Sequence, residues 1–278
     1  MELTSLKNIR NLLEKHGGWP KKSFGQNFLI NKGILMKIIE AGGISSKDEV
    51  LEIGPGIGTL TRELAKKAKR VVAVEKDRQM VEILKETVGG LKNAEVVSLD
   101  ATNINPFDFK LKHKKYKLFG NLPYYVSNPI IRKFLETEIQ PSLMVFIIQK
   151  EVAQRICTKA PDMTLLSASV QFYAKPEIIS YVSKGSFWPR PKVDGAIIKI
   201  IPFESFPDAD FSDNFFKIIK AGFSQPRKQL INNLSKGLTV DRGVIKEWLL
   251  KNNISPEQRA ETLKMEDWKK LTKNYPPC

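Results

Sequence analysis

Strand-like apolar runs alternate with helical patterns through the middle of this chain, and this alternation limits the possible folds more than any other feature. The runs typical of strands are Val50–Ile53, Val71–Val74, Glu95–Leu99, Lys117–Phe119 and Leu143–Ile148. Apolar residues at helical spacing lie between them, for example in Thr59–Ala68 and Gln79–Val88. Strands that alternate with helices form a parallel sheet covered by helices. The sequence therefore predicts an α/β fold with a Rossmann-like, mostly parallel sheet.

The two ends of the chain differ from this central part. A short leading helix is predicted by apolar residues at helical spacing, Leu6, Ile9, Leu12 and Leu13. Ile178–Val182 and Ala196–Ile201 are typical of two further strands, which we expect to add an antiparallel edge to the sheet. Beyond Pro202 the patterns indicate only short amphipathic helices, at Phe215–Ala221, Gln229–Leu234, Val244–Leu250 and Met265–Leu271. We therefore expect two domains, with the sheet in residues 1–202 and a small all-helical domain in residues 203–278.

The net charge of the chain points to an anionic partner. The sequence has 45 Lys and Arg residues against 30 Asp and Glu, which gives a formal charge of +15 and a pI of about 9.6. Such a balance is typical of nucleic-acid-binding proteins, although a basic solvated surface without a partner would have it too.

Cys157 and Cys278 lack metal-ligand spacing, and His16 and His113 are isolated, so we expect no metal site. With two cysteines, no membrane-length apolar run and no signal-like block after Glu2, a cytoplasmic location is expected.

A glycine-rich loop, Gly54-Pro55-Gly56-Ile57-Gly58, follows the first predicted strand and opens a helix. Its glycines permit the tight turn and the close backbone approach of a nucleotide-binding loop. A dinucleotide fingerprint would have glycine in place of Thr59, and Pro55 removes a backbone N–H that could hold a pyrophosphate. These departures argue against a nicotinamide oxidoreductase. The spacing, preceded by the acidic Glu52, instead resembles the first motif of S-adenosyl-L-methionine-dependent methyltransferases, whose cofactor has no phosphate.

Two carboxylates end the next two predicted strands. Glu75 ends the second strand, 21 positions after Gly54, where it could accept hydrogen bonds from ribose hydroxyls. Asp100 ends the third strand, where it could accept a hydrogen bond from the adenine amine of the cofactor. One such residue could equally be a helix cap. Two of them after a glycine-rich loop favour a cofactor site.

The segment Asn121-Leu122-Pro123-Tyr124 follows the fourth predicted strand, at the sheet edge where open α/β folds bind their ligands. Asn and Pro are also ordinary turn residues. The functional interpretation assigns a role to each residue. The Asn121 side-chain oxygen and the Pro123 carbonyl would accept the two hydrogens of an adenine amine and orient its nitrogen for methyl transfer, and Tyr124 would stack on the base.

Six blocks of the sequence, in order over nearly the whole chain, resemble the ribosomal RNA adenine dimethyltransferases. These blocks are Ser23–Leu29, the Gly54 loop, Asn121–Tyr124, Gln149–Val152, Phe187–Asp194 and Phe223–Asn232. The resemblance implies S-adenosyl-L-methionine as cofactor, held by Asn27, Leu29, Gly54, Gly56, Glu75, Asp100 and Asn121. It also implies that Phe187 covers a flipped adenine opposite Tyr124, so that the catalytic set is Asn121, Pro123, Tyr124 and Phe187.

The same resemblance implies the reaction and the partner. The reaction would be N6,N6-dimethylation of two adjacent adenines near the 3′ end of small-subunit (16S) rRNA, on the immature small ribosomal subunit. No heptad seam is evident in the sequence, and we expect a monomer. Residues 203–278 would contact the RNA. A large-subunit enzyme of the macrolide-resistance type and a non-catalytic ribosome-assembly factor are the alternatives.

Basic residues outside the motifs fall into two groups. The dense run from Lys110 to Lys117 precedes the fourth strand, so we expect it at the amino end of the sheet, away from the catalytic edge. Phosphate contacts are expected instead from the basic residues within or beside the six blocks, Lys21, Lys22, Arg190, Lys192, Arg227 and Lys228.

Overall fold

The computed structural model describes residues 1–21, 24–123, 126–205 and 207–275. The chain divides into two units, Met1–Ala153 with Pro176–Pro202, and Gln154–Lys175 with Phe203–Cys278. Residues 154–175 thus group with the C-terminal helices, although the sequence pattern places them in the domain 1–202. The two units are described separately.

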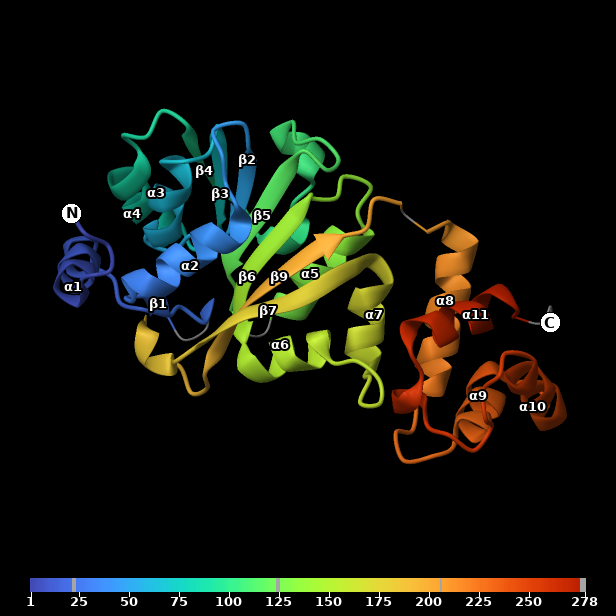
Figure 1. Ribbon diagram of the computed structural model, residues 1–278. Coiled ribbons are helices and arrows are strands. Elements are labelled where there is room, and N and C mark those ends of the chain that lie inside the picture. Colours follow the sequence, from blue (N-terminus) through green and yellow to red (C-terminus); the bar gives the residue numbers. More distant parts are fainter. Residues whose placement is uncertain (22–23, 124–125, 206, 276–278) are drawn as a thin grey trace. The chain divides into compact units, whose positions relative to one another are not determined.

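In the described residues, seven strands form the main sheet in the order β4-β3-β2-β5-β6-β9-β7 (Figure 1). Their bounds are Glu49–Ile53 for β2, Arg70–Glu75 for β3, Ala94–Ser98 for β4, Tyr116–Asn121 for β5, Leu143–Gln149 for β6, Ala174–Val182 for β7 and Gly195–Pro202 for β9. The strands β4, β3, β2, β5 and β6 are parallel, and β9 pairs antiparallel with β6. The predicted sheet, mostly parallel with an antiparallel addition at one edge, is confirmed.

The central strands are apolar on both faces because helices cover both faces of a parallel sheet. Four of these helices are α2 Lys32–Gly42, α3 Thr59–Ala65, α4 Arg78–Val88 and α5 Ser127–Glu136. Ile38 of α2 is buried in one cluster with Phe119 of β5 and Val145 of β6. Helix α3 ends at Ala65, three residues before the predicted end.

The predicted leading helix is α1, Leu6–Lys15. Its buried residues Ile9, Leu12 and Leu13 pack in one cluster with Phe28 and with Ile83 of α4. The N-terminal helix is therefore part of the first unit rather than an extension from it.

A second, very small sheet joins two distant motifs of the first unit. Strand β1, Phe28–Leu29, pairs antiparallel with β8, Phe187–Trp188. Phe28 lies opposite Trp188, and their rings are stacked with centroids 6.5 Å apart. The pairing brings the predicted cofactor-binding segment and the predicted adenine-covering segment side by side.

The second unit is helical. Its helices include α7 Leu165–Tyr173, α8 Ala209–Gly222, α9 Leu230–Leu238, α10 Arg242–Lys251 and α11 Met265–Lys273, and α6 Lys150–Cys157 runs across the unit boundary. Phe172 of α7 stacks on Phe215 of α8 with ring centroids 4.0 Å apart, which explains why residues 154–175 group with this unit. The four predicted C-terminal helices are all present. Nowhere in the described chain is a helix both long and apolar enough to cross a membrane.

Candidate active site

A cavity of about 280 Å³ lies in the first unit at the carboxyl ends of β2, β3 and β5. The chain passes from β2 to β3 and β4 on one side and then to β5 on the other, and open α/β sheets bind ligands at such a reversal of strand order. Nine of the predicted site residues line this cavity, namely Asn27, Leu29, Gly54, Gly56, Glu75, Asp100, Asn121, Pro123 and Phe187. Tyr124, the remaining one, lies outside the described residues.

The glycine-rich loop adopts backbone conformations that side chains disfavour. Gly54 has φ +67°, Gly56 φ +59° and Gly58 φ +86°. Gly58 is the N-cap of α3, and a Cβ atom there would lie 2.9 Å from Val88 of α4. The loop therefore requires glycine at positions 54 and 56 for its backbone conformation, and at position 58 also because a side chain would collide with α4.

Glu75 is held in place by backbone donors. One carboxylate oxygen accepts hydrogen bonds from the N–H groups of Lys76 (2.8 Å) and Asp77 (2.9 Å), and the other accepts one from Gly56 (3.1 Å). Burial raises the pKa of Glu75, and these three backbone donors oppose that rise. A carboxylate offers about four lone-pair sites, so the oxygen that faces Gly56 can still accept a hydrogen bond from a ligand.

Asp100 does not end a strand, contrary to the prediction. Strand β4 ends at Ser98, and Asp100 caps a short 3₁₀ helix by accepting hydrogen bonds from Thr102 N (2.9 Å) and Oγ1 (2.8 Å). Its other oxygen pairs with Lys76 Nζ at 2.6 Å. The hydrogen bonds from Lys76 and Thr102 lower the pKa of Asp100 to about 2, so it is ionised at neutral pH. Asp100 therefore caps a helix and also lines the cavity, and its contact with the adenine amine of the cofactor stays a prediction.

Asn121, the last residue of β5, has a defined side-chain orientation. Its Nδ2 donates a hydrogen bond to the backbone carbonyl of Asn27 at 2.9 Å. Because a carbonyl can only accept, the amide nitrogen must face Asn27, and the amide oxygen is left as the end that can accept a hydrogen bond from a ligand. Pro123 contributes a carbonyl that already accepts from Val126 N (3.1 Å) but has a second lone pair.

The cavity also has walls that the sequence motifs did not indicate. Phe24, Gly25 and Phe28 line it from the N-terminal segment, and Lys76 and Thr102 line it beside Asp100. Lys76 lies in a loop and Thr102 in a three-residue 3₁₀ helix, neither of which has a recognisable periodicity, so only their proximity to Glu75 and Asp100 in the sequence could have indicated them. Phe24, Gly25 and Phe28 belong to the Ser23–Leu29 block and could have been inferred from it, although no role was assigned to them.

Glu52 is a buried acid behind the glycine-rich loop, with 1% of its surface exposed. Among the described residues, neither its Oε2 atom nor the buried Thr61 hydroxyl has a hydrogen-bond partner. Burial raises the pKa of Glu52 to about 8, and the charge of Glu75 adds to the rise. The raised pKa favours the protonated, neutral form of Glu52 at neutral pH.

The dense basic run lies at the opposite end of the sheet, as predicted. Lys117 Nζ donates hydrogen bonds to Gly43 O (2.8 Å) and to Asp48 (3.1 Å), which immediately precedes β2. Lys114 Nζ donates to Pro202 O (3.0 Å). These lysines have partners within the protein at the amino ends of β2 and β5, away from the cavity.

The sequence is similar over nearly its whole length to proteins of one family. A family model described as ribosomal RNA adenine dimethylase matches residues 20–275. A ribosomal RNA small subunit methyltransferase A of Dehalococcoides mccartyi is 41% identical, over 97% of this chain and 94% of its own. The protein of the same name from Clostridioides difficile is 39% identical, over 97% of this chain and 96% of its own.

Solved structures agree with this similarity. A dimethyladenosine transferase from Plasmodium falciparum superposes with a TM-score of 0.74 and 31% identity, covering 87% of this chain and 95% of that chain. A 23S rRNA methyltransferase superposes with the same TM-score over 89% of this chain and 99% of that chain. Its identity is 23%, so the second likeness is one of fold.

Proposed function

The chain belongs to the ribosomal RNA adenine dimethylase family, and from this premise we propose that it dimethylates N6 of two adjacent adenines near the 3′ end of small-subunit rRNA, with S-adenosyl-L-methionine as methyl donor. The orientation of the Asn121 amide carries this proposal, because it presents an acceptor oxygen at the edge of the sheet where the cavity lies.

The chemistry of the cavity suits this cofactor. Three acidic side chains, Glu52, Glu75 and Asp100, and one basic side chain, Lys76, line it together with apolar residues. Glu75 and Asp100 outnumber the single cation Lys76, and a largely apolar pocket with such an acidic excess favours a cation without phosphate groups over a dinucleotide. We assign Glu75 to the ribose hydroxyls and Asp100 to the adenine amine. The glycine-rich loop, Asn27, Leu29 and Asn121 would hold the remaining part of the cofactor.

The catalytic residues prepare the target amine. When bound, the cofactor supplies an electrophilic methyl group on a sulfonium. The Asn121 amide oxygen and the Pro123 carbonyl accept the two N–H groups of the target adenine, which orients the nitrogen lone pair and stabilises the positive charge that develops as the N–C bond forms. As this bond forms, the S–C bond would break and the sulfur would leave as a neutral thioether, and the nitrogen then loses one proton to solvent. Phe187, which is 5% exposed and lines the cavity, covers the base, and Tyr124 would stack on its other face.

We propose small-subunit rRNA rather than large-subunit rRNA as the substrate because the chain is more similar in sequence to the relatives named for the small subunit. The relatives named for the small subunit are 39–41% identical over almost full length, whereas the 23S rRNA methyltransferase is 23% identical. We propose further that the protein acts in the cytoplasm as a monomer, and that its substrate is the immature small ribosomal subunit.

The test is methylation of isolated ribosomal particles. The purified protein is incubated with radiolabelled S-adenosyl-L-methionine and either immature small subunits or large subunits, and the labelled nucleotides are mapped. We expect dimethyladenine at two adjacent positions near the 3′ end of the small-subunit rRNA. Label in the large-subunit rRNA would establish the alternative substrate, and cofactor binding without any label would indicate a non-catalytic assembly factor.

A further inference from the structure

The N-terminal segment Phe24–Leu29 lines the cavity but contains little regular structure of its own. Its only strand is the two-residue β1, which pairs with β8. Gly25 has φ +62°, and Gly25 to Asn27 precede the strand. Gln26 N donates one long backbone hydrogen bond to Lys21 O (3.4 Å), and the other contacts that hold these residues involve side chains on two sides of the segment.

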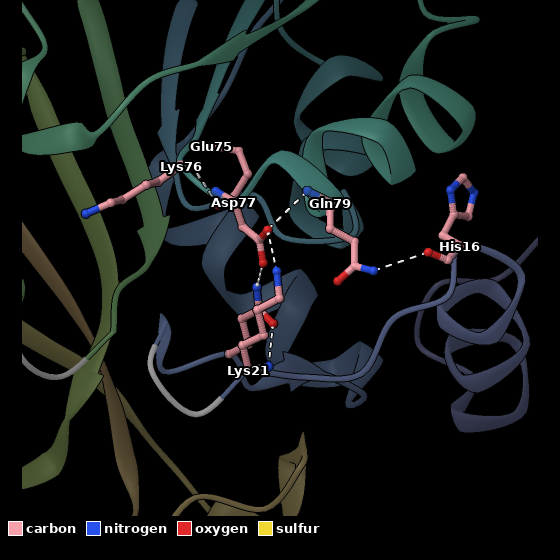
Figure 2. A network of polar contacts seen from close by, with 7 residues as sticks. His16, Lys21, Glu75, Lys76, Asp77 and Gln79 are labelled. Carbon is pink, nitrogen blue, oxygen red and sulfur yellow. Dashed lines mark hydrogen bonds and ion pairs between the residues drawn. The ribbon is translucent and has the colours of Figure 1, made fainter.

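On one side, the segment is attached to Asp77, the N-cap of α4. Asp77 is 3% exposed and uses both carboxylate oxygens. One oxygen accepts hydrogen bonds from Lys21 Nζ (2.9 Å) and Gln79 N (3.1 Å), and the other accepts one from Gln26 Nε2 (2.8 Å). Figure 2 shows Asp77 between Lys21 and Gln79. Burial alone would raise the pKa of Asp77, but the hydrogen bonds from Lys21 and Gln26 lower it, so the residue is ionised.

Gln26 uses both ends of its amide. While Nε2 donates to Asp77, Oε1 accepts a hydrogen bond from the backbone N–H of Lys21 at 2.8 Å. The side chain therefore joins the turn of the N-terminal segment to the loop between β3 and α4. Glu75, the last residue of β3, directly precedes this loop, and its carboxylate accepts a hydrogen bond from Asp77 N.

On the other side, the same residues contact the catalytic motif. The Asn27 carbonyl accepts the hydrogen bond from Asn121 Nδ2, and Asn27 Nδ2 donates to Gly25 O at 2.9 Å. A Cβ atom on Gly25 would lie 3.0 Å from Cβ of Pro123, so the two backbones pack closely. A shift of residues 25–27 would thus move the acceptor that orients the Asn121 amide.

We propose that Gln26 and Asp77 are positioning residues for catalysis, because their hydrogen bond holds the segment whose Asn27 carbonyl orients the Asn121 amide toward the target adenine. The inference rests on the proposed function and extends it to two residues that do not themselves act on the base. Loss of the pair allows the Asn27 carbonyl to move and the Asn121 amide to rotate. The acceptor oxygen is then misplaced in part of the molecules.

The test is a double-mutant cycle between Gln26→Ala and Asn121→Ala, with kcat measured on immature small subunits at saturating S-adenosyl-L-methionine. A misplacement of about 1 Å at a catalytic group can lower turnover on the order of 100-fold, so we expect Gln26→Ala to lower kcat by about 10- to 100-fold. In the Asn121→Ala background the same substitution should leave the residual kcat unchanged, because the group it positions is gone. Equal losses in both backgrounds would overturn the proposal.

A second test swaps the amide of Gln26 and the carboxylate of Asp77 between the two positions. This test does not require the alanine variant to fold well. Gln26→Glu alone places two carboxylates next to each other and should lower kcat. Gln26→Glu combined with Asp77→Asn restores one hydrogen-bond donor and one acceptor, so kcat of the double variant should be at least about tenfold higher than that of Gln26→Glu alone. No recovery in a double variant whose melting temperature equals that of the wild type would overturn the proposal.

Glu86→Gln is the matched control. Glu86 is on the same helix α4 and pairs with Lys15 and His16 of the N-terminal region, but it does not contact Phe24–Leu29. The Glu86→Gln variant should have the kcat of the wild type, and a loss of kcat equal to that of Gln26→Ala would overturn the proposal. Failure of the proposed function has a separate signature, because the wild-type protein itself would then place no methyl group on adenine N6.

Discussion

At the scale of single residues, the first unit fixes polar groups before a ligand binds. The Asn121 amide is oriented by the Asn27 carbonyl, and Glu75 is held by three backbone N–H groups. Groups that are already oriented toward the developing charge cost no reorganisation during the reaction. Two substitutions test this part of the description.

Asn121→Ala should abolish most turnover while the protein stays folded. Removal of one preorganised acceptor costs about 10²- to 10³-fold in kcat, or roughly 3–4 kcal/mol. Turnover is measured at saturating cofactor, and the RNA is digested and analysed by mass spectrometry at matched low conversion. Because monomethyladenine retains a single N–H that the Pro123 carbonyl could hold, residual product should be enriched in dimethyladenine. Near-wild-type turnover would contradict the catalytic role.

Glu52→Gln should make stability less dependent on pH. The pKa of Glu52 is about 8 in the folded chain, whereas an ordinary Glu, as in the unfolded chain, has a pKa of 4.5. Between pH 4.5 and pH 8 the folded state therefore binds more protons than the unfolded state. The contribution of Glu52 to the free energy of unfolding therefore falls as pH rises from 4.5 to 8, by about 3–5 kcal/mol, and the variant should lack this contribution while the one from Glu75 remains.

The measurement is urea unfolding of both proteins across this pH range, with Glu86→Gln for comparison. The hydrogen bonds from Lys15 and His16 lower the pKa of the exposed Glu86, so its removal should have a small effect of opposite sign, seen only as pH falls below about 4.5. Parallel curves for the wild type and Glu52→Gln would show that Glu52 is ionised in the folded protein.

At the scale of elements, the site depends on how closely β2 and β5 approach each other. Gly54 follows β2 and Asn121 ends β5, and Gly120 lies directly opposite Ile53 in the ladder. A Cβ atom on Gly120 would lie 2.7 Å from the backbone oxygen of Ile53. This glycine is therefore required by close packing of backbones beside the site, although it is not part of a glycine-rich motif.

Gly120→Ala should lower both stability and activity. Overpacking in a rigid core costs about 1–3 kcal/mol, and separation of the strands would shift Asn121 relative to the glycine-rich loop. Gly90→Ala is the control, because a Cβ atom there has no neighbour within 4 Å. The melting temperature and kcat of both variants provide the measurement. Equal behaviour of the two variants would show that the β2–β5 contact tolerates the added atom.

At the scale of the whole molecule, the charge of +15 favours a polyanionic partner, but it does not say where that partner binds. The first unit uses Lys114 and Lys117 in internal contacts, and Lys21 in the pair with Asp77. Positive charge along the sequence is therefore a poor guide to the RNA surface. Arg227 and Lys228 of the second unit are exposed and remain the predicted phosphate contacts.

Salt dependence distinguishes the two basic regions. Each phosphate contact contributes a slope of about −0.7 to −0.9 to the plot of log K against log salt, so replacing Arg227 and Lys228 together with Ala should reduce the slope by up to about 2. Replacing Lys112 and Lys115, which are exposed in the basic run, should leave it nearly unchanged. Binding is measured on small-subunit RNA at several salt concentrations. The reverse ranking would place the RNA surface at the amino end of the sheet.

The sequence alone determined the parallel sheet, the four C-terminal helices and nine of the residues that line the cavity. Hydrophobic periodicity and glycine spacing are local properties, and the carboxyl ends of parallel strands meet at one edge, so Gly54, Glu75 and Asn121 had to lie together. Tertiary structure alone decided the pairing of Phe28 with Trp188 and the contact of Phe172 with Phe215. It also decided the hydrogen bond from Gln26 to Asp77, the protonated state of Glu52 and the internal partners of the basic run. These features depend on burial and on contacts between residues far apart in the chain, which no local pattern encodes.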